Sequence, residues 1–197
     1  MAKKVVALVG SYRKGGTVDM TVDAVLNAAH ERGAETKKIY LIDQHIEYCR
    51  NCRACTQQAG PLGGKCVIED DVPAILSELD SADVIVLASP VNFYNITAVF
   101  RTFLERLVST AYWPWGQPAP KVRSKELPRK AVLIASMAAP RLFMNIATGA
   151  PRALRATANC LGARPVAKLW IGLAAQSTVP QLSARTLRRA RKIGQEL

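Results

Sequence analysis

Histidine is scarce in this sequence, which has two imidazoles, His30 and His45, among 197 residues. Neither stands in a pattern typical of a catalytic base, so we expect chemistry that needs no acid–base side chain. Long apolar runs are also missing, since none approaches the roughly 20 residues of a membrane span. The five apolar residues after Lys4 are too few for a secretion signal. These absences predict a cytoplasmic protein without a membrane partner.

Acidic residues are rare in the second half of the chain. Of 15 acidic residues, only Glu126 and Glu196 follow Pro120, so the net charge of +12 arises in that half. A basic surface can attract phosphorylated ligands, an acidic partner or nucleic acid, or it can be a solvated face. Because no nucleic-acid recognition motif accompanies the charge, we expect no nucleic-acid partner. The length and the 49% hydrophobic content predict one globular domain over residues 1–197.

The opening stretch carries the most informative pattern. An apolar strand over residues 5–9 runs into Gly10-Ser11-Tyr12-Arg13-Lys14-Gly15-Gly16-Thr17, and a helical pattern follows. The start of a helix leaves backbone N–H groups unpaired and carries partial positive charge, so it favours anions. Glycines let a phosphate approach the backbone, while hydroxyl and cationic side chains add hydrogen bonds and charge. Thr17 is expected to cap the helix.

This loop differs from two common phosphate-binding loops. It has no G-K-[ST] ending, and it lacks the G-x-G-x-x-G spacing of dinucleotide sites. We therefore expect a cradle for one terminal phosphate, with an ordinary glycine-rich turn as the alternative. The candidate residues are Ser11, Arg13, Lys14, Gly15, Gly16 and Thr17.

Strand and helix patterns alternate five times along the chain. Strands are predicted over 5–9, 35–41, 83–88, 130–135 and 164–171, and helices over 17–33, 70–81, 97–109, 148–161 and 182–197. This alternation predicts an α/β fold with a parallel sheet and helices on both faces. Five strands fit the flavodoxin-like order 2-1-3-4-5, in which ligands bind at the carboxyl ends of the strands. The loops after strands one, three and four should converge there.

Two segments together resemble the flavodoxin-like NAD(P)H-dependent FMN reductase family, and within it the iron–sulfur flavoproteins. They are the loop over 10–17 and the stretch from Gly64-Lys65-Cys66 to Ser89-Pro90-Val91-Asn92-Phe93-Tyr94. The resemblance implies that the first loop binds the FMN phosphate and that the second lies against the flavin ring. The flavin contacts that it implies are Pro90, Val91, Asn92, Phe93 and Tyr94, with Ser136 and Met137 in the loop after the fourth strand.

The chain departs from that branch in the first loop. Thr17 and Val18 stand where Asn and Thr are common, so one hydroxyl is missing and a lower affinity for FMN is expected. The second loop agrees with the family on the chemistry of its own residues. Asn92 can bond the polar edge of a flat ring, and Phe93 and Tyr94 can stack on its face. Alternatively, these two aromatic residues begin the next helix as core residues.

Four of the five cysteines lie in one segment. Cys49, Cys52 and Cys55 have the C-x2-C-x2-C spacing that wraps an iron–sulfur cluster, and Cys66 could be the fourth ligand. Ten residues separate Cys55 from Cys66, a longer gap than is usual in the related flavoproteins. A 4Fe-4S cluster, a four-thiolate zinc site and free or redox-active thiols all stay open. Cys160, within a helix pattern, is expected to be a small core residue.

The favoured hypothesis is an FMN-dependent oxidoreductase. NAD(P)H would deliver hydride to the flavin, which would then reduce a quinone, another small molecule, a metal ion or a redox protein. The basic second half favours NADPH. The aromatic, proline-rich stretch over 111–120 could cap the core, wall the active site or contact another subunit, and it favours a dimer or tetramer. The alternatives are an electron-transfer iron–sulfur flavoprotein and a non-catalytic flavin- or phosphate-binding module.

Overall fold

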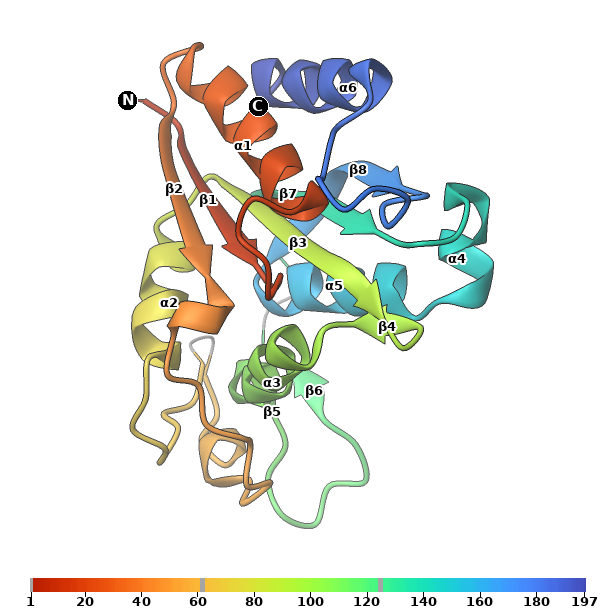
Figure 1. Ribbon diagram of the computed structural model, residues 1–197. Helices are drawn as coiled ribbons and strands as arrows, with labels where there is room; N and C mark the ends of the chain where they lie inside the picture. Colours follow the sequence, from red (N-terminus) through yellow and green to blue (C-terminus); the bar gives the residue numbers. More distant parts are fainter. Residues whose placement is uncertain (1, 61–62, 124–125) are drawn as a thin grey trace.

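Five parallel strands form the central sheet of the protein (Figure 1). The structure is a computed structural model that describes residues 2–60, 63–123 and 126–197. In chain order the strands are β1 (Lys4–Val9), β2 (Glu35–Tyr40), β3 (Val84–Asn92), β7 (Arg129–Ser136) and β8 (Ala163–Ile171). Their order across the sheet is β2-β1-β3-β7-β8, all parallel. The predicted order 2-1-3-4-5 is therefore confirmed.

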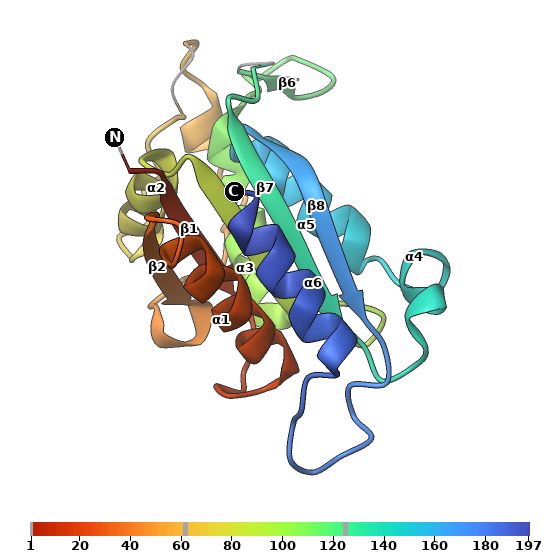
Figure 2. The same cartoon turned by 90° about the horizontal axis from the view of Figure 1, so that it is seen from above.

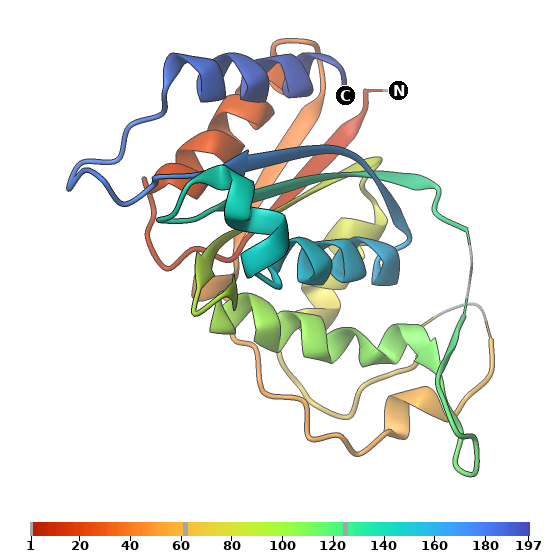
Figure 3. The same cartoon turned by 90° about the vertical axis from the view of Figure 1, so that its right-hand side faces the viewer.

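Helices cover both faces of this sheet (Figures 2 and 3). One face carries α1 (Thr17–His30) and α6 (Ala184–Gln195), and the other carries α2 (Val72–Asp80), α3 (Ala98–Arg106) and α5 (Ala150–Cys160). The side chains of residues 5–9 are fully buried because β1 has a helical layer on each side. Among the described residues, no helix is both long and apolar enough to span a bilayer.

The third strand is longer than the apolar run that predicts it. β3 continues through Ser89 to Asn92, and β4 (Asn95–Ile96) returns antiparallel to its last residues. Only Phe93 and Tyr94 remain between the two strands, so the expected loop over 89–95 is a tight hairpin. Pro90 is tolerated at this point since the end of β3 extends toward the margin of the sheet.

Several short elements were not expected from periodicity. They are the 3-10 turns η1 (Leu41–Asp43), η2 (Ala54–Thr56), η3 (Leu107–Thr110) and η4 (Arg141–Phe143), and the short helix α4 (Met144–Ala147). The proline-rich stretch also begins and ends in a small hairpin of β5 (Ala111–Tyr112) and β6 (Lys121–Val122). Such short pieces carry too few residues to show a period.

The core position expected for Cys160 is wrong. Its side chain is exposed, because it is the last residue of α5 and lies at the margin of the buried stripe. That stripe is formed instead by residues such as Ala153, Leu154 and Ala158.

Candidate functional site

The loop between β1 and α1 has the backbone of an anion cradle. Gly15 has a φ of +72°, a conformation that side chains other than glycine rarely adopt. Helix α1 begins at Thr17, so the first backbone N–H groups of the helix have no intrahelical partner. The helix cap is Gly16, with extended backbone, and no side chain bonds the helix start. The capping role expected for Thr17 is therefore wrong, because Thr17 is already helical.

Ser11 shapes the loop from within. Its side chain is buried, its hydroxyl donates to the Arg13 carbonyl at 3.0 Å, and it accepts the Arg13 N–H at 3.1 Å. The same carbonyl accepts the N–H of Gly16 at 3.3 Å. The hydroxyl thus fixes the turn that presents the helix start.

A buried carboxylate, which the sequence reading missed, holds the other side of the loop. Asp19 accepts the N–H of Gly15 at 2.7 Å, Lys38 Nζ at 2.8 Å and the Tyr40 hydroxyl at 2.9 Å. Burial opposes ionisation of Asp19, but these hydrogen bonds outweigh it and hold the pKa of the carboxyl below its usual value. An acidic residue in the first turn of a helix is a signal of the helix start that could have identified it.

The two cations of the loop have different surroundings. Lys14 Nζ lies 2.6 Å from Asp43 Oδ2 and 4.9 Å from the centre of the Tyr40 ring. Arg13 is exposed, and its guanidinium makes no ion pair within the described part of the chain. Arg13 is therefore the cation that is free to meet a phosphate.

The turn between β3 and β4 presents two aromatic side chains in an unusual conformation. Phe93 and Tyr94 both have positive φ, 44° and 65°, where Asn-Gly is the common pair. Their side chains are 99% and 74% exposed. The alternative that they begin the next helix as core residues is wrong, since α3 starts at Ala98. Bulky residues held in this conformation are a mark of functional sites.

The first loop contacts the segment that follows this turn. The Thr97 hydroxyl donates to the Gly10 carbonyl at 2.6 Å, and the Val99 N–H donates to the Tyr12 hydroxyl at 3.2 Å. A Cβ on Gly10 would lie 2.5 Å from the Phe100 ring, so only glycine allows this approach. The start of α3 thus packs against the first loop, directly after the aromatic turn.

The loop after β7 reaches the same edge of the sheet. Ser136 pairs in register with Pro90, so the ends of β3 and β7 lie side by side. Ser136 and Met137 are both buried, and the Met137 side chain belongs to the apolar core. The structure therefore brings the three loops together, while Met137 offers little side-chain surface to a ligand.

The cysteine-bearing segment, described over residues 44–60 and 63–66, lies beside α3 and the β5–β6 hairpin (Figures 1 and 3). The guanidinium of Arg53 lies over the rings of both Trp113 and Trp115, with centroid distances of 3.9 and 4.2 Å. It also donates to the Trp113 carbonyl at 2.7 Å. The aromatic loop therefore fastens the cysteine segment, a role not among those expected for it.

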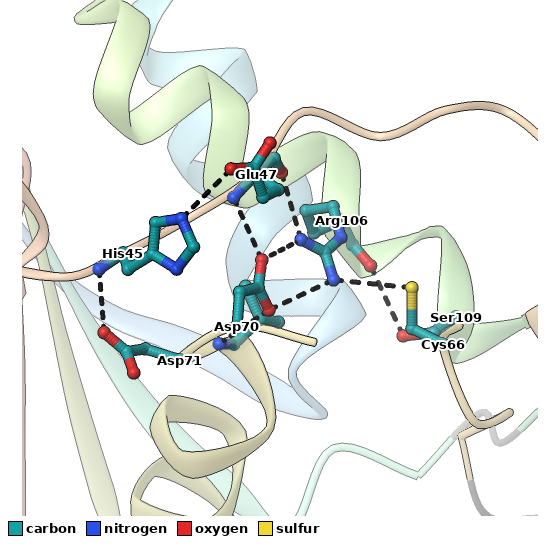
Figure 4. A network of polar contacts seen from close by, with 8 residues as sticks. His45, Glu47, Cys66, Asp70, Asp71, Arg106 and Ser109 are labelled. Carbon is teal, nitrogen blue, oxygen red and sulfur yellow. Dashed lines mark hydrogen bonds and ion pairs between the residues drawn. The ribbon is translucent and has the colours of Figure 1, made fainter. Parts of the chain in front are cut away.

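Two further arginines, from distant parts of the chain, bind the same segment. Arg123 donates to the carbonyls of Cys55, Gln58 and Gly60. Arg106, at the end of α3, forms a buried ion pair with Asp70 and donates to Cys66 Sγ at 3.4 Å (Figure 4). Nothing in the local sequence of the cysteines indicates these partners.

The comparison with protein families identifies the chain. The profile described as NADPH-dependent FMN reductase matches residues 3–176. The chain belongs to this FMN reductase family.

Curated relatives match about half of this chain. An iron–sulfur flavoprotein of Archaeoglobus fulgidus is 32% identical over 111 residues, which is 56% of this chain and 48% of the relative. One of Methanocaldococcus jannaschii is 38% identical over 103 residues, 52% of this chain and 51% of the relative. The matched region spans about half the length of each relative.

Solved structures of similar fold are reductases by name. An azoreductase from Bacillus anthracis superimposes with a TM-score of 0.73 at 15% identity, covering 99% of this chain and 100% of that one. An NAD(P)H:quinone oxidoreductase from Methanothermobacter marburgensis gives 0.72 at 17%, covering 99% and 98%. At these identities the likeness shows the flavodoxin-like fold.

The residues of the loops at the carboxyl ends of the strands fit an FMN group. The unpaired N–H groups at the start of α1 and the free Arg13 suit a phosphate, and the exposed aromatic turn suits a flat ring. These features lie at the carboxyl ends of the strands, where this fold binds ligands.

The four cysteines of this segment have the thiol chemistry of cluster ligands, but the structure does not gather them into a metal site. Burial raises the pKa of the Cys55 thiol, and the nearby Cys66, Cys49 and Cys52 raise it further. A Cβ on Gly64 would lie 1.6 Å from the Cys55 carbonyl oxygen, so this glycine lets the chain return to Cys55 before Cys66. Within the described ranges, no three His, Cys, Asp or Glu side chains are gathered as a metal site.

Proposed function

We propose that this reductase binds FMN at the carboxyl edge of the sheet and uses NAD(P)H to reduce a second acceptor. The observation that carries the proposal is the contact between the phosphate loop and the start of α3, which follows the aromatic turn. A ligand with a phosphate at one end and a flat ring at the other matches this pair of loops.

Each loop has a separate part in binding. The N–H groups that begin α1, together with Arg13, bind the phosphate, while Ser11 and Asp19 keep the loop in shape. Asn92 bonds the polar edge of the ring, and the exposed aromatic turn packs beside it. Bound flavin supplies hydride acceptance and electron release.

The chain supplies orientation and electrostatics, and no acid–base side chain is required. The basic second half favours the extra phosphate of NADPH. The acceptor is a quinone, another small molecule, a metal ion or a redox protein. We also propose that the protein works as a homo-oligomer, because the aromatic turn exposes apolar surface that a second subunit could cover.

A second candidate function is single-electron transfer between FMN and a 4Fe-4S cluster held by Cys49, Cys52, Cys55 and Cys66. The observation that favours it is the position of α3. Its first turn contacts the phosphate loop, and its last residue, Arg106, contacts Cys66. The helix therefore joins the two sites over about 12 Å, at 1.5 Å per residue.

The test is an anaerobic titration of the purified protein loaded with FMN. Addition of NADPH should bleach the flavin absorption, and an added quinone should restore it. A Cys49→Ser/Cys66→Ser variant serves as the matched control, because it should keep this bleaching and lose bound iron. A protein that binds FMN without being reduced by NADPH or NADH would be a binding module, and the enzyme proposal would be wrong.

A further inference from the structure

The last helix of the chain carries a row of positive charge on its outer side. α6 buries only a narrow stripe, in which Ala190 and Gly194 pack against α1 (Figure 2). A Cβ on Gly194 would lie 2.2 Å from the Val25 carbonyl oxygen, so only glycine allows the two helices to approach this closely. The opposite side of α6 carries exposed cations at the spacing i, i+3, i+4 and i+7, which places them on one face of a helix. We call this face the basic ridge, and its residues are Arg185, Arg188, Arg189 and Lys192.

The charge of the basic ridge is almost uncompensated within the chain. In the part of the chain that the structure describes, the three arginines of the ridge form no ion pair, and Lys192 Nζ has only an exposed contact with Glu196 at 3.7 Å. The neighbouring Arg191, which lies outside the ridge, is the cation that pairs with Glu31 of the next segment at 3.0 Å. The ridge therefore directs its charge toward solvent.

Local helix chemistry opposes this arrangement. Like charges one turn apart destabilise a helix, and Arg185 lies in the first turn, where the positive end of the helix disfavours a cation. α3 shows the ordinary alternative, since its exposed Arg101 pairs with Glu105 one turn later at 2.9 Å. A face that only meets water does not need a row of like charges. The broken local rule indicates that the ridge has a partner.

The chemistry of the chain narrows the class of partner. Most of its acidic side chains are already engaged by its own cations, as Asp43 is by Lys14 and Asp80 by Arg129, so a second copy offers little free acidic surface. α6 has no aromatic side chain on which a nucleic-acid base could stack. Its buried stripe faces α1, so the helix has no apolar face that could enter a lipid surface. Arginine, by contrast, pairs with carboxylates through two parallel hydrogen bonds.

We propose that the basic ridge docks the acidic surface of another protein. Carboxylates of the partner pair with the arginines of the ridge, and the field of the ridge steers the partner during its approach. Leu187 lies beside the ridge with 41% of its surface exposed and adds an apolar contact, as protein interfaces combine the two kinds of contact. The inference does not depend on FMN binding, because the ridge lies on the outer face of α6 and not in the loops at the carboxyl ends of the strands.

The experiment measures binding of a fluorescein-labelled helical peptide that carries glutamates at i, i+3, i+4 and i+7, by fluorescence anisotropy. Wild type is compared with Arg185→Gln/Arg188→Gln and with the matched control Arg152→Gln/Arg155→Gln. The control removes the same charge from exposed positions of α5, on the other face of the sheet. The ridge variant should weaken binding about tenfold, mainly through slower association, and the control less than about twofold. Wild-type affinity should fall as salt shortens the Debye length to about 8 Å.

A short DNA duplex and vesicles of phosphatidylcholine and phosphatidylglycerol are tested in parallel. Tighter binding of either one through the ridge, an equal loss in the ridge variant and the control, or no binding of the peptide at low salt would overturn the inference. The melting temperature of the ridge variant should equal or exceed that of wild type, since like charges are removed. A lower melting temperature would show that these cations stabilise the helix and would contradict the proposal. FMN affinity should be the same in all three proteins.

Discussion

The phosphate loop and the cysteine segment are built in opposite ways. The phosphate loop is shaped mostly by bonds between near neighbours, such as Ser11 with Arg13 and Gly15 with Asp19. The cysteine segment is held by arginines that lie about 40 to 70 residues away along the chain. The loop is therefore a local structure on a rigid sheet, while the segment depends on tertiary contacts for its shape.

This difference predicts how each region fails. A local loop loses affinity in small steps, because each bond contributes separately. A segment held by a few buried, charged contacts loses its shape when one of them is removed, since the remaining charge stays buried and unpaired. The cysteine segment should accordingly be the more fragile region.

The largest effect is expected for Arg106→Met. It leaves Asp70 buried without its partner, and unfolding in urea should show a loss of about 3–5 kcal/mol. The exposed pair of Arg101 and Glu105 offers the control, where Arg101→Met should cost no more than about 0.5 kcal/mol. Similar losses in the two variants would remove the contrast between buried and surface pairs.

Gly10→Ala should have the next largest effect. The added Cβ would lie 2.5 Å from the Phe100 ring and push α3 away from the phosphate loop. Overpacking of this kind costs about 1–3 kcal/mol in unfolding free energy. Adding Phe100→Leu should recover part of the loss, and calorimetry of the single and double variants measures it. If Phe100→Leu recovered none of the lost stability, the contact between Gly10 and Phe100 would not be the source of the strain.

A charge substitution in the loop separates its two cations. Arg13→Gln should weaken FMN binding about tenfold, because it removes a charge-assisted bond to the phosphate. Lys14→Gln should weaken it less than about twofold, since Lys14 is already paired with Asp43. Quenching of flavin fluorescence gives both affinities, and a larger effect for Lys14 would reverse the assignment.

The smallest effect is expected for Asp19→Asn, about 1 kcal/mol at neutral pH, because the amide still accepts the Gly15 N–H. The folded-state pKa of Asp19 is lowered. Its ionised form therefore stabilises the fold above the unfolded pKa of about 4, and this contribution is lost as pH falls through the folded value. The stability difference between wild type and variant should shrink below about pH 4, and a constant difference would contradict the role of the charge.

The sequence alone indicates the sheet order and the phosphate loop, because both follow from local patterns. The buried run over 5–9 and the glycine pair Gly15-Gly16 need no distant partner to be interpreted. The contacts of Arg53, Arg106 and Arg123 could not be predicted, since each joins segments far apart in the chain. The role of the aromatic stretch was missed for the same reason, although its composition marked it as unusual.

The central claim is that a phosphate occupies the start of α1 while a flavin ring lies by the aromatic turn. The most direct measurement compares the affinities of FMN and riboflavin, which differ by that phosphate, for wild type and Arg13→Gln. Wild type should prefer FMN by at least about tenfold, the size of one charge-assisted contact, and Arg13→Gln should lose most of that preference. Equal affinity of wild type for FMN and riboflavin, or no binding of either, would contradict the account.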